Sequence, residues 1–325
     1  MAVSLDSTPS RSTGPGPAAP LAVAVALLLV YVIWGSTYLG IRVVVEDVPP
    51  LLGMGSRFLT AGLLLGGLLA LRGGLARLRV TPAEWVGCAF LGLMLPVLGN
   101  GLVAIGESRG APSGVTALLV ATVPLNIMVL RALTGSRPGA IALIGVVVGL
   151  VGVALLALTG GGAEADIPLG ATAVVLLAAA FWSFGSWYQP RLSMPSDPMV
   201  ATVHEMLVGG VLLLTFGVIR GERAGLTGHP TDAWIAWVYL VLFGSMVGYT
   251  AYVWLLHNAP ISLVATYAYV NPVVAVVLGA LILDEAITSM MLVGGGLIVV
   301  AVAVVITVER KPQVIATDEV PPEPG

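Results

Sequence analysis

The sequence predicts an all-α membrane protein whose ten transmembrane helices form two inverted five-helix repeats. Of the 325 residues, 58% are hydrophobic and 10% are charged, which leaves too little polar surface for a soluble domain of this length. The apolar stretches fall into two sets of five that match at a spacing of about 149 residues. A bilayer core of about 30 Å needs roughly 20 apolar residues per helix, so ten helices use roughly 200 residues and leave short connections.

The elements follow in a regular order. Residues 1–20 are rich in Ser, Thr, Pro and Gly and residues 309–325 are polar and Pro-rich, so we expect two disordered cytoplasmic tails. The first repeat, 21–158, is expected to span the membrane at 21–41, 50–71, 85–105, 114–133 and 139–158. After an acidic external linker at 159–167, the second repeat, 168–308, is expected to span it at 169–188, 199–219, 234–256, 261–283 and 288–308. A signal peptide does not explain the first span, because its apolar run continues to Val45 without a cleavage site followed by polar sequence.

The basic residues predict the orientation, because cytoplasmic loops carry an excess of Lys and Arg. With the N-terminus inside, the inner set is Arg11, Arg72, Arg77, Arg79, Arg131, Arg137, Arg191, Arg310 and Lys311, and the outer set is Arg42, Arg109, Arg220 and Arg223. The inner set is more than twice as large as the outer one. We therefore expect a multi-pass protein of the inner (plasma) membrane with both termini in the cytoplasm.

The two sets of spans match in detail. The segment Trp34–Tyr38 aligns with Phe184–Tyr188. In the other spans Gly99 aligns with Gly248 and Pro124 with Pro272, and further glycines and tryptophans also align. Chance similarity between Gly- and Leu-rich helices does not explain five pairs in the same order. A repeat with an odd number of spans enters the membrane from opposite sides, so the halves are antiparallel, which is the usual basis of alternating access.

The same segments resemble the EamA family of the drug/metabolite transporter superfamily. The resemblance rests on Trp34–Tyr38, Arg57-Phe58, Pro124, Pro272 and Asp284-Glu285, and covers residues 21–308. It implies ten helices in two EamA units and export of small metabolites, such as amino acids, or of cationic drugs. One position departs from the family: the acidic residue that often follows the fourth span is Ser136 here, beside Arg137, whereas Glu285 is retained.

Aromatic stripes are candidates for gates. Trp34 and Tyr38 share one helical face in the first span, and Phe184 and Tyr188 share one in the sixth. Because the halves are inverted, each stripe could close one end of a central cavity. Packing of aromatic residues is the alternative interpretation.

Polar residues within the spans are candidates for substrate binding, since polar groups at this depth cost free energy unless they are paired. These candidates are Asn100, Thr122, Asn126, Tyr249, Tyr252, Tyr269 and Asn271. Hydrogen bonding between helices, worth about 0.6 kcal/mol on average, is the alternative. Pro124 and Pro272 each remove a backbone hydrogen bond and are candidate hinges or static kinks.

Few ionisable residues fall within the spans. Glu107 and Glu205 are candidates for proton coupling. As a charge within a span Arg57 is a functional candidate as well, and the interpretation we favour is that it anchors its helix by extending its side chain to the membrane surface. The sequence contains no paired-carboxylate or Ser-His-Asp constellation, no phosphate-binding loop and no metal-ligand spacing. We therefore expect no enzyme activity, no cofactor or metal, and no nucleic-acid partner.

These observations favour a secondary transporter that works by alternating access. Aromatic and amide groups suit a small neutral, zwitterionic or cationic substrate. The expected partners are that substrate, the lipid bilayer, and either a proton or a counter-solute. A membrane-embedded sensor or scaffold and a passive channel remain the alternatives.

Overall fold

The computed structural model describes residues 20–135, 139–158, 168–223, 228–259, 261–264 and 266–309. The predicted tails, Ser136, Arg137 and the linker 159–167 lie outside the described residues, apart from the single residues at the inner edges of the two tails. Within the described ranges all regular structure is helical. Seven helical segments of these ranges are long and apolar enough to cross a membrane, and three further apolar helices, Ala140–Leu155, Val270–Ile282 and Ser289–Val305, are shorter.

The long helices overlap the predicted spans, but the predicted spans 114–133 and 261–283 are each divided into two helices, and two short helices lie in the connections. In the first half they are α1 (Pro20–Asp47), α2 (Pro50–Gly73), η1 (Leu75–Leu78), α3 (Pro82–Gly92), η2 (Leu93–Gly101), α4 (Leu102–Ser108), α5 (Ser113–Val120), α6 (Val123–Leu133) and α7 (Ala140–Leu158). In the second half they are α8 (Leu169–Tyr188), η3 (Gln189–Arg191), α9 (Pro198–Ile219), α10 (Thr231–Tyr239), η4 (Leu240–Tyr249), α11 (Thr250–Asn258), α12 (Ile261–Val264), α13 (Tyr267–Ile282) and α14 (Ser289–Glu309).

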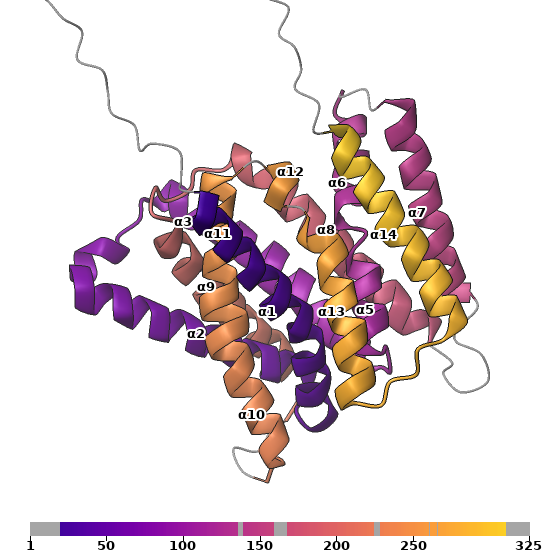
Figure 1. The fold of residues 1–325 in the computed structure, drawn as a ribbon. Helices are drawn as coiled ribbons and strands as arrows, with labels where there is room; N and C mark the ends of the chain where they lie inside the picture. Colours follow the sequence, from indigo (N-terminus) through magenta and orange to yellow (C-terminus); the bar gives the residue numbers. More distant parts are fainter. Residues whose placement is uncertain are drawn as a thin grey trace, which may run out of the picture.

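Equivalent helices of the two halves pack against each other. α2 lies against α9, and α7 lies beside α14 at one side of the molecule (Figure 1). Glycines make both contacts close: a Cβ on Gly210 would lie 2.5 Å from the backbone nitrogen of Leu59, and a Cβ on Gly152 would lie 2.6 Å from the carbonyl oxygen of Gly294. Small residues that let helix backbones approach are typical of packing in membranes.

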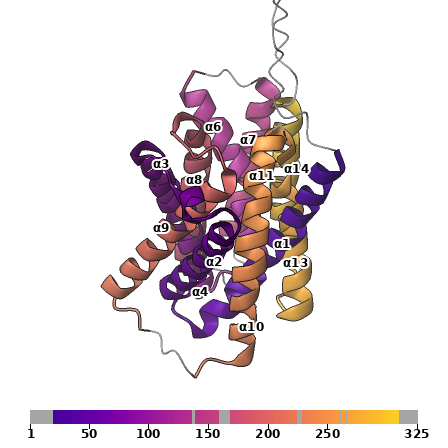
Figure 2. The same ribbon diagram turned by 90° about the vertical axis from the view of Figure 1, so that its left-hand side faces the viewer.

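The first helix of each half packs into the other half. α1 lies against α10, η4, α11 and α13, and α8 lies against η2, α4, α5 and α6 (Figure 2). The matched glycines again sit at the contacts, since a Cβ on Gly35 would be 2.6 Å from Val274 Cβ and one on Gly185 would be 2.7 Å from Met94 Cβ. The space between the halves is therefore bordered by α1 and α8.

Two glutamates cap helices of the opposite half. Glu285 accepts hydrogen bonds from the backbone nitrogens of Ser113 (2.8 Å) and Gly114 (3.2 Å) at the start of α5. Glu222 accepts them from Leu51 (3.1 Å) and Leu52 (3.0 Å) at the start of α2. A carboxylate satisfies the free N–H groups at a helix N-terminus and complements its dipole. Glu285, which the resemblance singled out, thus joins the two halves.

Both halves contain a π-helical segment at the same place. η2 follows α3 and η4 follows α10, in the two spans that match each other at a spacing of about 149 residues. A π-helix makes hydrogen bonds from residue i to i+5 and is frequent at functional sites. These segments place Asn100 and Tyr249 near their carboxyl ends.

Candidate functional site

A cavity of about 60 Å³ lies between the two halves. Its walls come from α1, α2, η2, α4, α5, α8, η4 and α13. Its lining residues are Trp34, Thr37, Tyr38, Ile41, Arg57, Phe58, Gly99, Asn100, Val103, Val120, Ala178, Ala179, Trp182, Gly244, Tyr249 and Tyr267. The volume holds a few water molecules, whereas pockets for small ligands measure about 300 to 1,000 Å³. A metabolite therefore needs a movement of side chains or helices to enter.

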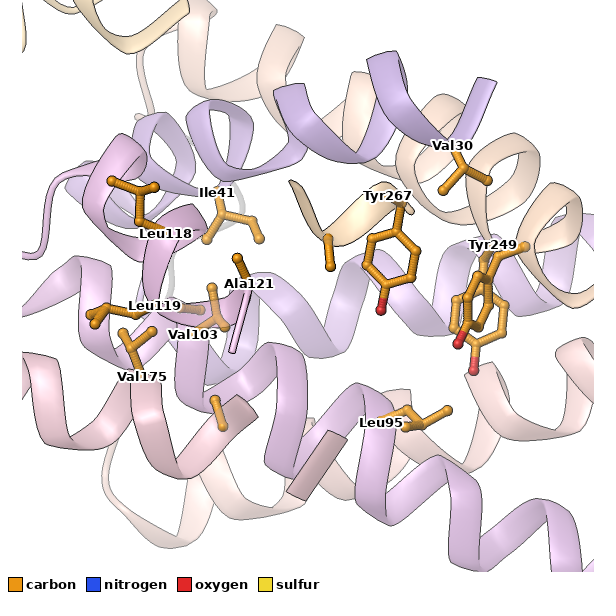
Figure 3. Packing of buried hydrophobic residues seen from close by; sticks show 14 of the residues in the cluster. Val30, Ile41, Leu95, Val103, Leu118, Leu119, Ala121, Val175, Tyr249 and Tyr267 are labelled. Carbon is orange, nitrogen blue, oxygen red and sulfur yellow. The ribbon is translucent and has the colours of Figure 1, made fainter. Parts of the chain in front are cut away.

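Aromatic rings from four helices meet around Trp34. Its indole lies 4.7 Å from the ring of Tyr252, 5.6 Å from Tyr267, 5.8 Å from Trp182 and 6.3 Å from Tyr249, measured between ring centroids. We call these five residues the aromatic cluster. Figure 3 shows the Tyr249 and Tyr267 hydroxyl groups among the buried side chains, away from the aliphatic group around Leu118 and Leu119. Tilted and edge-to-face contacts at these distances stabilise ring pairs.

Glycines in the π-helical segments leave the space into which the side chains of Trp34 and Trp182 pack. A Cβ on Gly248 would lie 2.8 Å from Trp34 Nε1, and a Cβ on Gly99 would lie 2.7 Å from Trp182 Cε3. Gly99 and Gly248 are partners in the sequence repeat, so each half supplies a glycine against which a tryptophan of the opposite half packs. The Trp34 indole also donates to the carbonyl of Gly244 at 3.3 Å.

Arg57 is buried in the wall of the same cavity, with 3% of its surface exposed. Its Nε donates to Ser245 Oγ at 2.9 Å, and its guanidinium carbon lies 4.7 Å from the centre of the Phe58 ring. The expected extension of this side chain to the membrane surface is therefore wrong. Arg57 lies on the face of α2 that packs against η4, so its side chain is enclosed by the protein.

Tyr249 connects the cavity to a buried carboxylate. Its hydroxyl donates to Glu205 Oε2 at 2.5 Å, and Glu205 is 3% exposed. The ion pairs of the described residues join Arg42 with Glu46 and Arg77 with Asp197, so neither involves Glu205. A solute that binds the Tyr249 hydroxyl would compete with Glu205 for it.

Glu107 is more deeply enclosed. It is 0% exposed, and neither of its carboxylate oxygens has a hydrogen-bond partner among the described residues. It lies one turn beyond Val103, which lines the cavity. Its backbone carbonyl accepts a hydrogen bond from Arg42 Nη1 at 2.6 Å.

The structure brings four of the predicted site residues to the cavity: Trp34, Tyr38, Asn100 and Tyr249. Thr122 donates to the Leu119 carbonyl of its own helical region at 2.6 Å. The amide nitrogen of Asn271, in the orientation that satisfies it, donates to the carbonyls of Tyr31 (3.2 Å) and Tyr267 (3.3 Å). The cavity lining includes neither Thr122 nor Asn271, and the Tyr269 side chain lies outside the described residues.

Phe184 and Tyr188 form a second aromatic group. Their rings stack at 5.8 Å, and Phe90 lies 6.2 Å from Phe184 and 5.5 Å from Tyr188. The aromatic residue that α8 contributes to the cavity wall is instead Trp182. Positions two residues apart lie about 200° apart around a helix, so Trp182 and Phe184 face different ways.

Pro124 lies at an interruption between two helices, whereas Pro272 lies inside a helix. Pro124 is the second residue of α6, directly after the break between α5 and α6 at Ala121 and Thr122. Pro272 lies inside α13, which begins at Tyr267, and the preceding helix α12 ends at Val264. A proline ring removes a hydrogen bond and disfavours helix in the residue before it.

Sequence reasoning missed Thr37, Trp182 and Tyr267 as cavity residues and assigned Arg57 another role. Thr37 belongs to the segment Trp34–Tyr38, on which the repeat and the family resemblance rest, so the sequence did indicate that it could be a cavity residue. Trp182 and Tyr267 lie close to Phe184 and Tyr269, and a helical wheel drawn from Trp34 does not reveal which neighbour faces the cavity. Among the residues that the structure describes, no group of three His, Cys, Asp or Glu side chains is placed to hold a metal ion.

Comparisons with known proteins agree with this arrangement. The model of the EamA-like transporter family matches residues 21–158 and 169–307. A protein of Escherichia coli named uncharacterized inner membrane transporter YedA is 40% identical over 282 residues, which are 86% of this chain and 89% of YedA. A WAT1-related chloroplastic protein of Arabidopsis thaliana is 27% identical, over 86% of this chain and 68% of its own. A crystal structure that is 20% identical in sequence aligns with 90% of this chain and 100% of its own, with a TM-score of 0.62.

Proposed function

Because the chain belongs to the EamA-like transporter family, we propose that it is a secondary transporter that binds a small metabolite in the cavity between its two halves. The observation that carries this proposal is the composition of the cavity wall, to which both halves contribute a first helix and a π-helical segment. Ten membrane helices in two inverted units would make that wall shared between two bodies that move against each other.

The chemistry of the wall indicates the substrate. The aromatic cluster offers ring faces to an apolar group or a diffuse cation, and the Asn100 amide, which forms no side-chain hydrogen bond to another described residue, offers a donor and an acceptor. A small neutral, zwitterionic or cationic metabolite such as an amino acid fits this combination. Export as the direction follows from the family resemblance.

The proposed location is the inner membrane, with both termini in the cytoplasm. The name of YedA, an inner membrane transporter, supports the location in the inner membrane. The distribution of arginines supports the orientation of the termini. In this orientation the Tyr38 end of α1 lies toward the outside and the Tyr188 end of α8 toward the inside. The second aromatic group would then close the inner end of the pathway.

Glu205 is the proposed site of proton coupling. Its carboxylate is buried and its hydroxyl partner, Tyr249, lines the cavity, so substrate binding and proton binding would share one group. Glu107 is the second candidate, because its carboxylate is buried without a hydrogen-bond partner in the described part of the chain.

Counterflow in proteoliposomes tests the transporter function. Vesicles are loaded with unlabelled neutral and aromatic amino acids, and uptake of each labelled amino acid is followed. A carrier gives a transient accumulation of label, whereas a passive channel gives simple equilibration and a sensor or scaffold gives neither. Trp34→Ala removes the centre of the aromatic cluster and should lower the apparent affinity about tenfold or more.

Trp85→Ala is the matched control for that variant. Trp85 lies at the start of α3, is 50% exposed and is absent from the cavity wall. Its substitution should leave counterflow unchanged. Equal losses in both variants would count against a substrate site at Trp34.

A further inference from the structure

The structure supports a narrower substrate class than the aromatic residues alone. We propose that Arg57 binds the carboxylate of the substrate, so that the transported molecule is a compact carboxylate with an apolar body, such as a zwitterionic amino acid. This inference rests on the proposed transporter function and names the ligand chemistry of the same cavity.

The first step is that Arg57 has no charged partner among the residues that the structure describes. A guanidinium carries five N–H donors and is always protonated in proteins. The described residues give it one hydrogen bond, from Nε to Ser245 Oγ at 2.9 Å, and one weak contact, from Nη1 to Met54 Sδ at 3.6 Å. Both ion pairs of the described residues involve other arginines.

The second step is the cost of this arrangement. A charge buried without a partner loses its hydration, and in real proteins the penalty amounts to several kcal/mol. A structural role would be served by a neutral side chain of similar length, or by an arginine paired with a carboxylate. A buried and unpaired guanidinium at the wall of a cavity is destabilising, which indicates a ligand that supplies the missing negative charge.

The third step is the position of the guanidinium relative to the aromatic cluster. Both converge on Gly244: a Cβ on this residue would lie 3.0 Å from Arg57 Nη2, and its carbonyl accepts the hydrogen bond of Trp34. A carboxylate bound to Arg57 through two parallel hydrogen bonds would therefore have Trp34 beside it. The body of the ligand would extend toward the rings, and an α-ammonium group could lie over a ring face.

The fourth step concerns exclusion. A ligand that carries a positive charge and no negative one would enter a cavity whose wall already holds an unpaired cation. Repulsion in a medium of low dielectric constant disfavours it strongly. Cationic drugs, which the family resemblance allows, are therefore disfavoured for this chain.

Matched ligands test the proposal on the purified, reconstituted protein. Phenylalanine, 3-phenylpropionate and phenethylamine share one ring and differ in their charged groups, and leucine, isovalerate and isopentylamine form an aliphatic series. Binding is measured by ligand-induced thermal shift and by inhibition of counterflow. The wild type should bind the members that contain a carboxylate. Arg57→Gln should weaken their binding at least about tenfold, and Arg57→Lys should restore part of it.

The control is Arg72→Gln, at the exposed carboxyl end of the same helix, which should bind all ligands as the wild type does. Amine-only ligands that bind the wild type and Arg57→Gln equally well would overturn the assignment of Arg57 and leave the transporter function standing. Failure of every carboxylate to bind the wild type would also overturn it. A folded wild type that shows no counterflow at all would count against the transporter function itself.

A measurement without ligand separates binding from structure. Arg57→Met removes the unpaired charge and keeps an unbranched side chain in the same space. If Arg57 serves the ligand, this variant should keep or raise the melting temperature while it loses carboxylate binding. A melting temperature lowered by more than about 5 °C would assign Arg57 to the structure and overturn the proposal.

Discussion

A single hydroxyl group, that of Tyr249, lies between the cavity and the carboxylate of Glu205. In the described part of the chain, the Cys88 thiol of α3 and the Tyr252 phenol of α11 interact electrostatically with this pair. None of them is a base that would hold the Glu205 carboxylate in its charged form. As the coupling residue that we propose, Glu205 would exchange a proton with the pathway when Tyr249 turns toward a solute.

Glu205→Gln tests the proposed role of Glu205 in proton coupling, because it replaces an ionisable carboxyl group with an amide of nearly the same shape. The amide oxygen still accepts the Tyr249 hydrogen bond and the side-chain volume is conserved, but the side chain no longer ionises. We expect counterflow, which needs no energy source, to continue within about a factor of two. Uptake driven by a pH gradient should be lost.

Counterflow and uptake driven by a pH gradient are measured in the same preparation of proteoliposomes, and their comparison identifies the coupling carboxylate. If gradient-driven uptake survives in Glu205→Gln and disappears in Glu107→Gln, the coupling carboxylate is Glu107. If it survives in both variants, the driving ion is not bound by either residue.

At the scale of helices, glycines decide how closely the two halves approach. Gly210 of α9 faces the backbone of α2, where a Cβ would lie 2.5 Å from Leu59 N, whereas Gly67 of α2 has no neighbour within 4 Å of its Cβ position. The same residue type therefore has opposite roles on two packed helices. Only the first is needed for the contact.

Gly210→Ala should destabilise the protein by about 1 to 3 kcal/mol, because a backbone must move to accommodate the methyl group. Gly67→Ala should be neutral or stabilise the helix by up to about 1 kcal/mol. Thermal unfolding of both variants in the same detergent checks this. A loss of stability in Gly67→Ala equal to that in Gly210→Ala would show that helix propensity, not the contact between helices, is measured.

The sequence predicted helices better than it predicted their faces. Apolar length placed the long helices, and the predicted span 21–41 lies within α1, whereas the short helices η1 and η3 lie outside the predicted spans. The π-helical segments were not predicted, because their hydrogen bonds leave no periodicity that differs clearly from that of an α-helix over nine or ten residues. The buried position of Arg57 was missed for a related reason: depth in the membrane can be estimated from position along a span, but the partner of each helix face depends on tertiary packing.

At the scale of the molecule, the two halves are coupled because the first helix of each half packs against helices of the other half. α1 packs into the second half and α8 into the first, so a rotation of one half moves a helix that borders the cavity from the opposite side. The aromatic cluster around Trp34 lies at the cavity, and the second aromatic group around Phe184 lies at the end of α8 that we propose to be the inner end of the pathway. Opening at one end should therefore accompany closing at the other.

Two cysteine variants test this coupling, and the sequence makes them simple to build because Cys88 is its single cysteine and is buried. In a Cys88→Ala background, Tyr38→Cys and Tyr188→Cys each report on one end of the pathway. A membrane-impermeant thiol reagent is applied to vesicles of known orientation, to the outside for the first and to the inside for the second. A saturating substrate should change the two labelling rates in opposite directions, by about twofold or more for a shift between two states of similar population. Changes of both rates in the same direction would mean that the ends open together, as in a channel, and alternating access would have to be abandoned.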